Sequence, residues 1–259
     1  MIKSAKELAI MAEGGKKLSR ILKEVLEKVG PGISTLEIDS WTEERIIAAG
    51  GIPSFKSVPK YHWATCTGLN EEVVHSIPRK DKLIKEGDLL KIDLGMCYQG
   101  FHTDLSWTVL VSNIATEQHS NKDKSYLEKL KFLEAGKRAL NEAIKVAKEG
   151  NRIGHISQKI EEIITGAGYR PVEVLTGHGI GQRLHEEPMI PGVLRRRLKD
   201  TPELVSGMTL AIEVIYCLGS SEVVMKKDGW TIVSKDGKIA GLFERTIAVS
   251  GYKPIVITP

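Results

Sequence analysis

Hydrophobic spacing predicts helices in both halves of the chain. Apolar residues recur every three to four positions in four segments, which cover residues 7–29, 35–49, 127–146 and 153–165. Ser34 stands three residues before Glu37, the spacing of a capping box at a helix start. Glycines follow each predicted helix, as is typical of helix ends.

Continuous apolar runs predict strands after each pair of helices. These runs cover residues 89–94, 105–111, 209–216 and 241–249. Residues 53–78 predict further strand and loop, and the polar segment 113–124 predicts an exposed connection. Each half therefore has the same predicted order of two helices followed by antiparallel strands.

A weak internal similarity supports a duplication at an offset of 120 residues. Gly32–Leu36 resembles Arg152–Ile156, and the segment ending at Asp93 resembles the segment ending at Glu213. Beyond a longer insertion, Asp104 aligns with Glu244. We expect one α+β domain over residues 1–259, built of two pseudo-symmetric halves (about 1–120 and 121–259). Its two half-sheets would meet at a pseudo-two-fold axis, with helices on the outer face.

Composition limits the class of protein more than its function. Hydrophobic residues make up 41% and charged residues 27% of 259 residues, which excludes disordered, collagen-like and disulfide-scaffold proteins. Three cysteines without a Cys-x-x-Cys pair are typical of a reducing compartment. No apolar run has the length of a membrane span, and residues 1–15 lack the apolar core of a signal peptide.

The net charge of +4 is too small to indicate a nucleic-acid-binding protein. One basic cluster stands out, Arg195–Arg197 with Lys199. We interpret it as a solvated loop, since short basic runs are common on surfaces. The alternative is contact with a polyanion such as ribosomal RNA.

Four carboxylates lie in apolar strand-like runs. The glycines between Asp93 and Asp104 predict a hairpin turning near Tyr98–Gln99, which would place these two residues directly opposite each other. Two ionised carboxylates at that distance repel unless a cation or a proton lies between them. Strand ends facing solvent are the alternative for this pair alone.

Glu213 and Glu244 lie in the two most apolar strands, where a buried carboxylate must be paired, protonated or bound to metal. Arg245 is adjacent to Glu244 and therefore points to the opposite face of its strand. Four such carboxylates together indicate a metal site far more specifically than any one of them.

Three histidines could complete this chemistry. His178 lies between glycines, which allow close backbone approach, while His75 lies in an apolar stretch and His185 begins the segment His-Glu-Glu-Pro. Each alone is more often structural. The glycine spacing does not fit a dinucleotide-binding loop. Beside four acidic residues, one imidazole can serve as a metal ligand and two as proton or hydrogen-bond donors.

In order and spacing, these residues resemble the metal ligands of the methionine aminopeptidases, in the short bacterial type I form. The resemblance covers nearly the whole chain and extends to the flanking motifs, namely 70–78, 91–95, 176–181, 185–188 and 228–231. It implies the pseudo-two-fold "pita-bread" fold, an antiparallel sheet covered by helices. It also implies two divalent metal ions, which could be Co, Mn, Fe or Zn.

The resemblance also implies roles for individual residues. The metal ligands would be Asp93, Asp104, His178, Glu213 and Glu244, with Asp104 and Glu244 bridging both ions. His75 and His185 would contact the substrate, and Glu213 would carry a proton to the leaving amine. Three residues match positions that line the methionine pocket: Tyr61, Cys66 and Trp230. His102 would lie just behind the ligands.

The implied reaction is hydrolysis that removes the N-terminal methionine from nascent polypeptides with a small second residue. A metal-activated water would attack the methionine carbonyl, and His185 would stabilise the developing oxyanion. The resemblance further implies a cytoplasmic monomer without a membrane segment, in possible transient contact with the ribosome.

Several residues depart from the family pattern. They are Leu184, Leu242, Ile215, Arg245, Gln182–Arg183 and the stretch from Met189 to Asp200. None is a ligand, so these departures concern side-chain specificity and peptide reach.

Three alternatives remain open from the sequence. Prolidase and aminopeptidase P share the fold and ligands but usually carry a large additional N-terminal domain. A non-enzymatic relative would bind RNA or protein and would have lost ligands, whereas all five remain here. An α/β binding protein with coincidental acids would not place four carboxylates in apolar strands.

Overall fold

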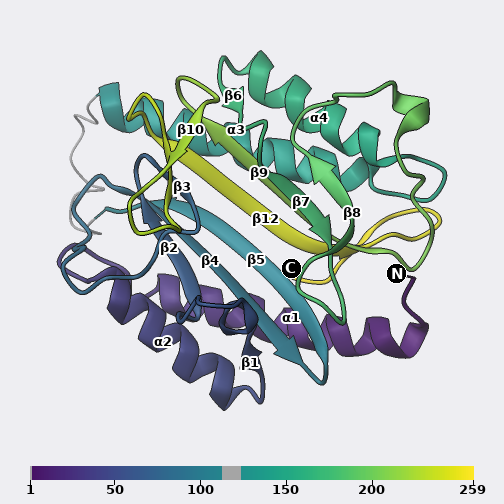
Figure 1. Cartoon of the computed structure of the whole chain (residues 1–259), viewed down its shortest axis with the longest axis horizontal. Coiled ribbons are helices and arrows are strands. Elements are labelled where there is room, and N and C mark those ends of the chain that lie inside the picture. The colour runs from purple at the N-terminus through teal and green to yellow at the C-terminus, as the bar shows by residue number, and fades with distance from the viewer. Residues whose placement is uncertain (1, 113–123) are drawn as a thin grey trace.

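One long antiparallel sheet organises the chain, and its helices pack behind it in the view of Figure 1. The computed structural model describes residues 2–112 and 124–259. The predicted exposed connection, residues 113–124, lies outside the described residues except for Lys124, which begins a helix. No helix within the described ranges combines the length and apolar character needed to cross a bilayer.

The four predicted helices are confirmed. They are α1 (Ala5–Leu26), α2 (Thr35–Ala48), α3 (Lys124–Val146) and α4 (Ile153–Gly166). The predicted capping box begins α2, where Ser34 Oγ accepts from the Glu37 amide at 3.2 Å and the Ser34 amide donates to Glu37 Oε2 at 2.9 Å. Ser4 and Glu7 form the same box at the start of α1. Both boxes satisfy amide groups that a helix start leaves without partners.

The principal sheet has ten strands. Its path runs β1 (Ile52–Pro53), β4 (Leu89–Tyr98), β5 (Phe101–Leu110), β12 (Ala240–Ala248), β9 (Thr209–Cys217), β7 (Thr176–Gly179) and β8 (Glu186–Pro191). Off this path, β2 (Thr65–Leu69) pairs with β4, β6 (Arg170–Pro171) with β9 and β13 (Ile255–Val256) with β12. The central strands β5 and β12 join the two halves.

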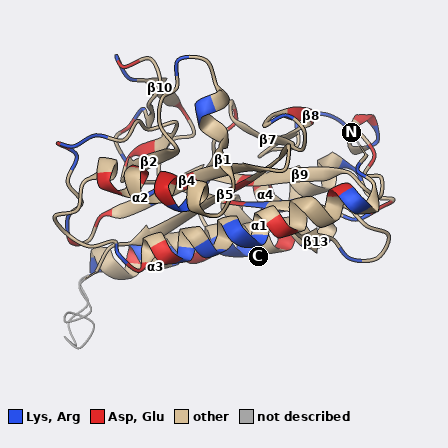
Figure 2. Ribbon diagram, turned by 90° about the horizontal axis from the view of Figure 1, so that it is seen from below, with Lys and Arg blue, Asp and Glu red and all other residues tan. Residues whose placement is uncertain are grey.

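A second sheet of three strands contributes to the other side of the molecule. It consists of β10 (Val223–Met225), β11 (Ile232–Ser234) and β3 (Glu72–Val74). In the part of the chain that the structure describes, short 3₁₀ helices η1 (Ser54–Ser57) and η3 (Leu198–Asp200) lie in connections. In Figure 2, β10 and β8 lie above the principal sheet, whereas α1 and α3 lie below it.

Strand alternation separates the core from the acidic residues. On the helix side, α1 and α2 pack on Ile92 and Leu94 of β4, while α3 and α4 pack on Ile212 of β9 and Phe243 of β12. Neighbouring positions on these strands therefore point to the opposite face. That face receives the four carboxylates, away from the helices.

The predicted register of the β4–β5 hairpin is wrong by two residues. Asp93 lies opposite Ser106, and Asp104 lies opposite Gly95. The turn falls at Gln99–Gly100 because both residues adopt positive φ, at 48° and 84°, as a two-residue hairpin turn requires. Asp93 and Asp104 still share a face, but they are diagonal neighbours rather than a directly opposed pair.

The register also corrects the predicted alignment of Asp104 with Glu244. Asp93 lies opposite Ser106, Glu213 lies opposite Glu244, and Ser106 and Glu244 face each other across β5 and β12. If Asp93 and Glu213 are equivalent, Glu244 corresponds to Ser106 and not to Asp104. The insertion between the strands hid this two-residue difference from the sequence.

Candidate metal centre

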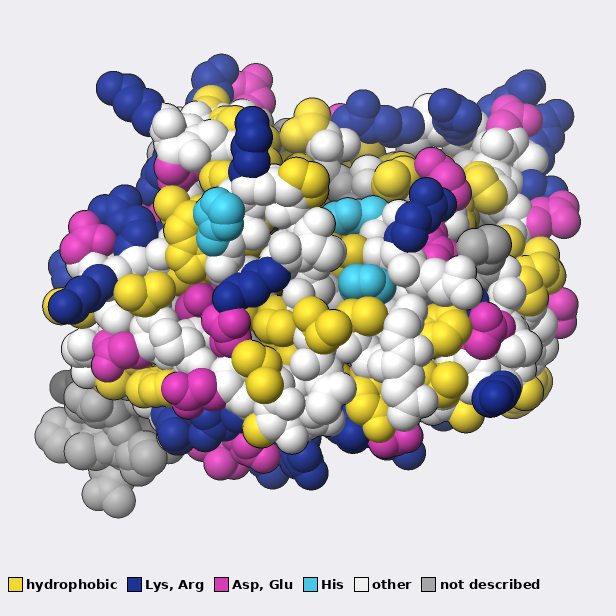
Figure 3. Space-filling view, turned by 60° about the horizontal axis from the view of Figure 1, so that its bottom comes forward, with side chains coloured by type: hydrophobic (Ala, Val, Ile, Leu, Met, Phe, Trp, Pro, Cys, Tyr) yellow, Lys and Arg dark blue, Asp and Glu magenta, His cyan; other side chains and the backbone are white. Residues whose placement is uncertain are grey.

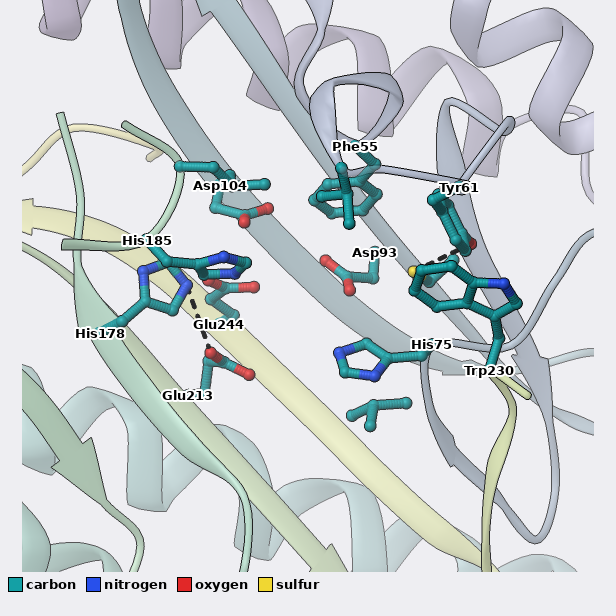
Figure 4. A pocket seen from close by; sticks show the side chains of 14 residues that line it. Phe55, Tyr61, His75, Asp93, Asp104, His178, His185, Glu213, Trp230 and Glu244 are labelled. Carbon is teal, nitrogen blue, oxygen red and sulfur yellow. Dashed lines mark hydrogen bonds and ion pairs between the residues drawn. The ribbon is translucent and has the colours of Figure 1, made fainter. Parts of the chain in front are cut away.

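The four carboxylates gather at the middle of the principal sheet. Asp93 and Asp104 come from β4 and β5, and Glu213 and Glu244 come from β9 and β12. Figure 4 shows their carboxyl groups pointing into one shared space. Asp104 and Glu244 are only 4% and 2% exposed, so this space lies within the protein rather than on its surface.

Burial and mutual repulsion disfavour the charged forms of these acids. Burial raises the pKa of Asp104 to about 7. Burial, and then the charges of Asp104 and Glu213, raise the pKa of Asp93 well above its ordinary value, and the pKa values of Glu213 and Glu244 are raised in the same way. Among the described residues that line this cavity, none is a lysine or an arginine. A neutralising charge must therefore come from protons or from a bound cation.

Two orphaned oxygens favour a cation. Asp93 Oδ1 and Glu244 Oε1 are buried and have no hydrogen-bond partner among the described residues. Buried polar atoms without partners are rare in proteins and require an explanation. Ligand atoms of Asp104, His178 and Glu244 all lie within 4.8 Å of one another. Carboxylate oxygens with one imidazole nitrogen are donors that suit a divalent transition metal, so the residues present fit such an ion.

His178 is oriented as a ligand would be. Its Nδ1 lies 2.8 Å from the Gly179 carbonyl oxygen, which can only accept, so Nδ1 carries the proton and Nε2 keeps its lone pair. Nε2 lies 3.6 Å from Glu213 Oε1. Burial and the neighbouring His185 lower the pKa of His178 to about 4, which keeps the imidazole neutral.

The glycines around His178 are required by close packing between strands. A Cβ on Gly177 would overlap the Ala211 carbonyl oxygen of β9, and one on Gly179 would overlap the Glu187 carbonyl oxygen of β8. This confirms the inference from sequence that glycines here allow close backbone approach. They bring β7 near enough to β9 for His178 to reach the carboxylates.

His75 and His185 stand at the mouth of the cavity, where both side chains are exposed. Figure 3 shows histidine side chains at the surface of this face, among apolar groups. The rings of His178 and His185 make an edge-to-face contact with centroids 4.4 Å apart. His75 has a positive φ of 55°, which is uncommon for a residue with a side chain. Desolvation lowers the pKa of both mouth histidines.

The other end of the cavity is apolar. Tyr61, Cys66 and Trp230 line it, and the whole cavity has a volume of about 150 Å³. The Tyr61 hydroxyl donates to the Thr65 carbonyl oxygen at 2.8 Å and lies 3.1 Å from Cys66 Sγ. The rings of Tyr61 and Trp230 pack edge to face with centroids 5.0 Å apart. The cavity thus joins an acidic end to an apolar end.

The structure brings together all ten residues predicted for the site. It adds three apolar residues that the sequence did not single out, namely Phe55, Val58 and Val74, and it places Leu184, already noted as a departure, in the same lining. Phe55 and Val58 belong to η1 and its end, a region without hydrophobic periodicity, so no pattern identified them. His102 does not line the cavity, and its Nδ1 lies 2.8 Å from Ser54 Oγ in η1.

The departures from the family pattern occupy different places. Leu184 lines the cavity, whereas Leu242 and Ile215 pack with each other in a separate apolar cluster. Arg245 lies on the helix face, with its guanidinium 5.0 Å from the centre of the Trp107 ring. Of these residues, Leu184 alone lines the described cavity.

Known metallopeptidases resemble this chain over nearly its whole length. The model of metallopeptidase family M24 matches residues 9–250. Methionine aminopeptidase 1 of Bacillus subtilis is 38% identical over 248 residues, covering 96% of this chain and 94% of its own. The methionine aminopeptidase of Aquifex aeolicus is 34% identical, with coverage of 98% and 97%.

Solved structures agree as well. A methionine aminopeptidase from Thermotoga maritima superimposes with a TM-score of 0.91 at 34% identity and covers 100% of this chain and 98% of its own. A prolidase from Pyrococcus furiosus shares the fold at a TM-score of 0.74 and 23% identity, and this chain spans only 65% of it. The chain has the pita-bread fold and belongs to metallopeptidase family M24, as a relative of the bacterial methionine aminopeptidases.

Proposed function

We propose that this chain is a metal-dependent aminopeptidase that removes the N-terminal methionine from polypeptides. One observation carries the proposal: a single cavity joins four clustered carboxylates and His178 to an apolar pocket. The acidic end suits a metal and a positively charged α-amine. The apolar end suits an uncharged side chain such as that of methionine. The 34–38% identity to methionine aminopeptidases supports the same reaction.

The proposed ligands are Asp93, Asp104, His178, Glu213 and Glu244, for two divalent ions from among Mn, Fe, Co and Zn. Asp104 and Glu244 are the most deeply buried carboxylates of the cluster, and both would help to hold the ions. When bound, such ions lower the pKa of a water and polarise the substrate carbonyl. The orphaned oxygens of Asp93 and Glu244 support their assignment as ligands.

Side chains of the chain itself would position the peptide. His185 donates a hydrogen bond to the scissile carbonyl oxygen as negative charge develops there. His75, at the cavity mouth, holds the scissile amide. Glu213 moves a proton to the leaving amine.

The shape of the cavity supports the expected specificity. A volume of about 150 Å³ limits what can enter beside the first side chain. We infer that Tyr61, Cys66 and Trp230 bind the methionine side chain and that only a small second residue fits near His75 and His185. Leu184 is the departure placed to alter this preference.

The test is release of methionine from a Met-Ala-Ser peptide by metal-stripped protein before and after addition of Mn²⁺, Fe²⁺, Co²⁺ or Zn²⁺. An Xaa-Pro peptide and a Met-Leu-Ser peptide run beside it. We expect metal-dependent release from Met-Ala-Ser alone. Cleavage of the prolyl peptide instead would place the activity with the prolidases, and no cleavage despite bound metal would refute the proposal.

We also propose a cytoplasmic monomer that contacts the ribosome transiently. Arg195 pairs with Glu173 at 2.8 Å and Arg197 with Asp200 at 2.7 Å, so internal ion pairs engage two of the three arginines. Among the ion pairs of the described residues, none involves Arg196, which makes it the strongest candidate for an RNA contact. The test is co-sedimentation of the parent protein and Arg196→Glu with ribosomes. Equal co-sedimentation of the two proteins would exclude a ribosome contact through Arg196.

A further inference from the structure

The imidazole of His185 is held by its loop and not by direct hydrogen bonds. Among the described residues, no group donates to or accepts from this ring, and its one described ring contact is with His178. The side chain is exposed at the cavity mouth. Its position therefore depends on the backbone of residues 181–186, which joins β7 to β8.

A buried ion pair supports this loop from beneath. Lys3 Nζ donates to Glu186 Oε2 at 2.8 Å, and the two side chains are 3% and 2% exposed. The other oxygen, Glu186 Oε1, accepts from the Arg183 amide at 3.1 Å. One carboxylate thus connects Lys3 to the backbone on both sides of His185. A charged hydrogen bond in a dry interior is strong and directional.

The N-terminal segment is itself fixed in place. The Lys3 amide donates to the Gly207 carbonyl oxygen at 2.8 Å, and Ile2 forms a bridge with Met208. The next residue, Ser4, caps α1. Lys3 is therefore anchored to the turn before β9 and to the start of α1 before its side chain reaches the loop.

The loop is also shaped to admit the lysine. A Cβ on Gly181 would overlap both Cε and Nζ of Lys3, so the lysine crosses directly over this glycine. The Gly181 carbonyl oxygen accepts from the His102 amide at 2.7 Å, which holds the opposite side of the same glycine. Lys3, Gly181 and Glu186 therefore pack closely together beneath the loop.

We propose that the Lys3–Glu186 pair positions His185 for the reaction, so that Lys3 is a positioning residue 182 places away in the sequence. This inference rests on the proposed function. It does not involve the metal ligands, because the pair contacts the loop and not the carboxylate cluster. Loss of the pair would let the His185 ring shift while the metal centre stays intact.

The test is a double-mutant cycle with Lys3→Met, His185→Ala and their combination. We expect Lys3→Met to lower kcat on Met-Ala-Ser about tenfold to a hundredfold, as small displacements of a reacting group do, with little change in KM. In the His185→Ala background the same substitution should change kcat by less than about twofold, because the group that Lys3 positions is gone. Lys6→Met, an exposed lysine of α1, is the matched control and should leave kcat unchanged.

Hydrogen exchange in the metal-free protein gives a readout independent of activity. Amides of residues 181–186 should exchange faster in Lys3→Met, while those of β4 and β5 should not. Because removing the lysine takes away the cation that faces a buried glutamate and can itself destabilise the protein, Lys3→Met/Glu186→Gln is made as well and should show the same loop exchange and the same loss of kcat.

Two results separate the possible failures. If the parent protein does not release methionine, the proposed function fails. If the parent is active but Lys3→Met lowers kcat equally in both backgrounds, or leaves kcat and loop exchange unchanged, the positioning role is wrong and the proposed function stands.

Discussion

Glu213 of β9 and Glu244 of β12 lie directly opposite each other across two paired strands. Both strands are otherwise almost wholly apolar, and both carboxyl groups have raised pKa values because of burial and, next, the charge of Asp104. Two acids in this relationship oppose folding unless something neutralises them. The chain keeps them, which we attribute to a metal ion that both help to bind.

Glu244→Gln should weaken metal binding. The amide keeps the size of the side chain but removes its charge, so we expect affinity for Mn²⁺ to fall at least about tenfold. Isothermal titration calorimetry of metal-stripped protein measures this directly. Glu222→Gln, an exposed carboxylate paired with Lys235, serves as the control. Equal affinity in Glu244→Gln and the parent would remove Glu244 from the ligand set.

The same variant should stabilise the metal-free protein, increasingly so at higher pH. The pKa of Glu244 is higher in the folded protein than in the unfolded chain. The folded state therefore becomes less stable relative to the unfolded state as the pH rises above about 4, where the unfolded carboxyl ionises. The gain in unfolding free energy for Glu244→Gln should therefore grow between pH 5 and pH 8.

Urea unfolding in the presence of a chelator measures this pH dependence. Saturating Mn²⁺ should reverse the order, since the parent binds the ion more tightly and ligand binding stabilises the folded state. A stability difference that stays constant with pH would contradict the assigned cause.

His75→Asn should lower activity without lowering stability. Asparagine tolerates the left-handed backbone that His75 adopts, so the substitution removes the imidazole and leaves the turn unstrained. We expect kcat/KM on Met-Ala-Ser to fall about a hundredfold, with the free energy of unfolding within about 0.5 kcal/mol. Gln99→Asn, at an exposed positive φ in the β4–β5 turn, is the matched control. Unchanged kcat/KM would exclude a role for His75 in the reaction.

Trp230→Leu should act on substrate binding. Its ring packs on Tyr61 at the apolar end of the cavity, away from the carboxylates (Figure 4). Loss of this wall should raise KM for Met-Ala-Ser about tenfold, the effect of roughly 1.4 kcal/mol of apolar contact, with a smaller change in kcat. Trp41→Leu, in the α1–α2 core, tests for a general packing effect and should leave KM unchanged. A fall in kcat without a change in KM would show that Trp230 acts in the catalytic step and not in substrate binding.

The helices, and the four carboxylates as a set that needs neutralisation, could be predicted from the sequence because both depend on local pattern. Apolar spacing located α1 to α4, and the Ser34–Glu37 box located the start of α2. Carboxylates such as Glu213 stood out because an acid in an apolar strand needs a partner. These inferences use neighbours in the chain and need no tertiary information.

Register was beyond the reach of the sequence. The sequence pattern correctly placed Asp93 and Asp104 on one face of the sheet. It could not fix which residues of the two strands lie opposite each other, because sliding one strand by two residues leaves every side chain on the same face. The positive φ of Gln99, an ordinary polar residue, decided the turn. For the same reason the sequence could not align Glu244 with Ser106.

The sequence by itself determined which residues carry charge, which faces are apolar and where helices begin. Tertiary structure alone decided the distances among Asp104, His178 and Glu244, the joining of the apolar pocket to them, and the support of His185 by Lys3. The physical reason is that helices and strand faces depend on residues close together in the chain, which the sequence pattern records. Cavities and buried ion pairs, in contrast, arise where segments far apart in the chain pack together.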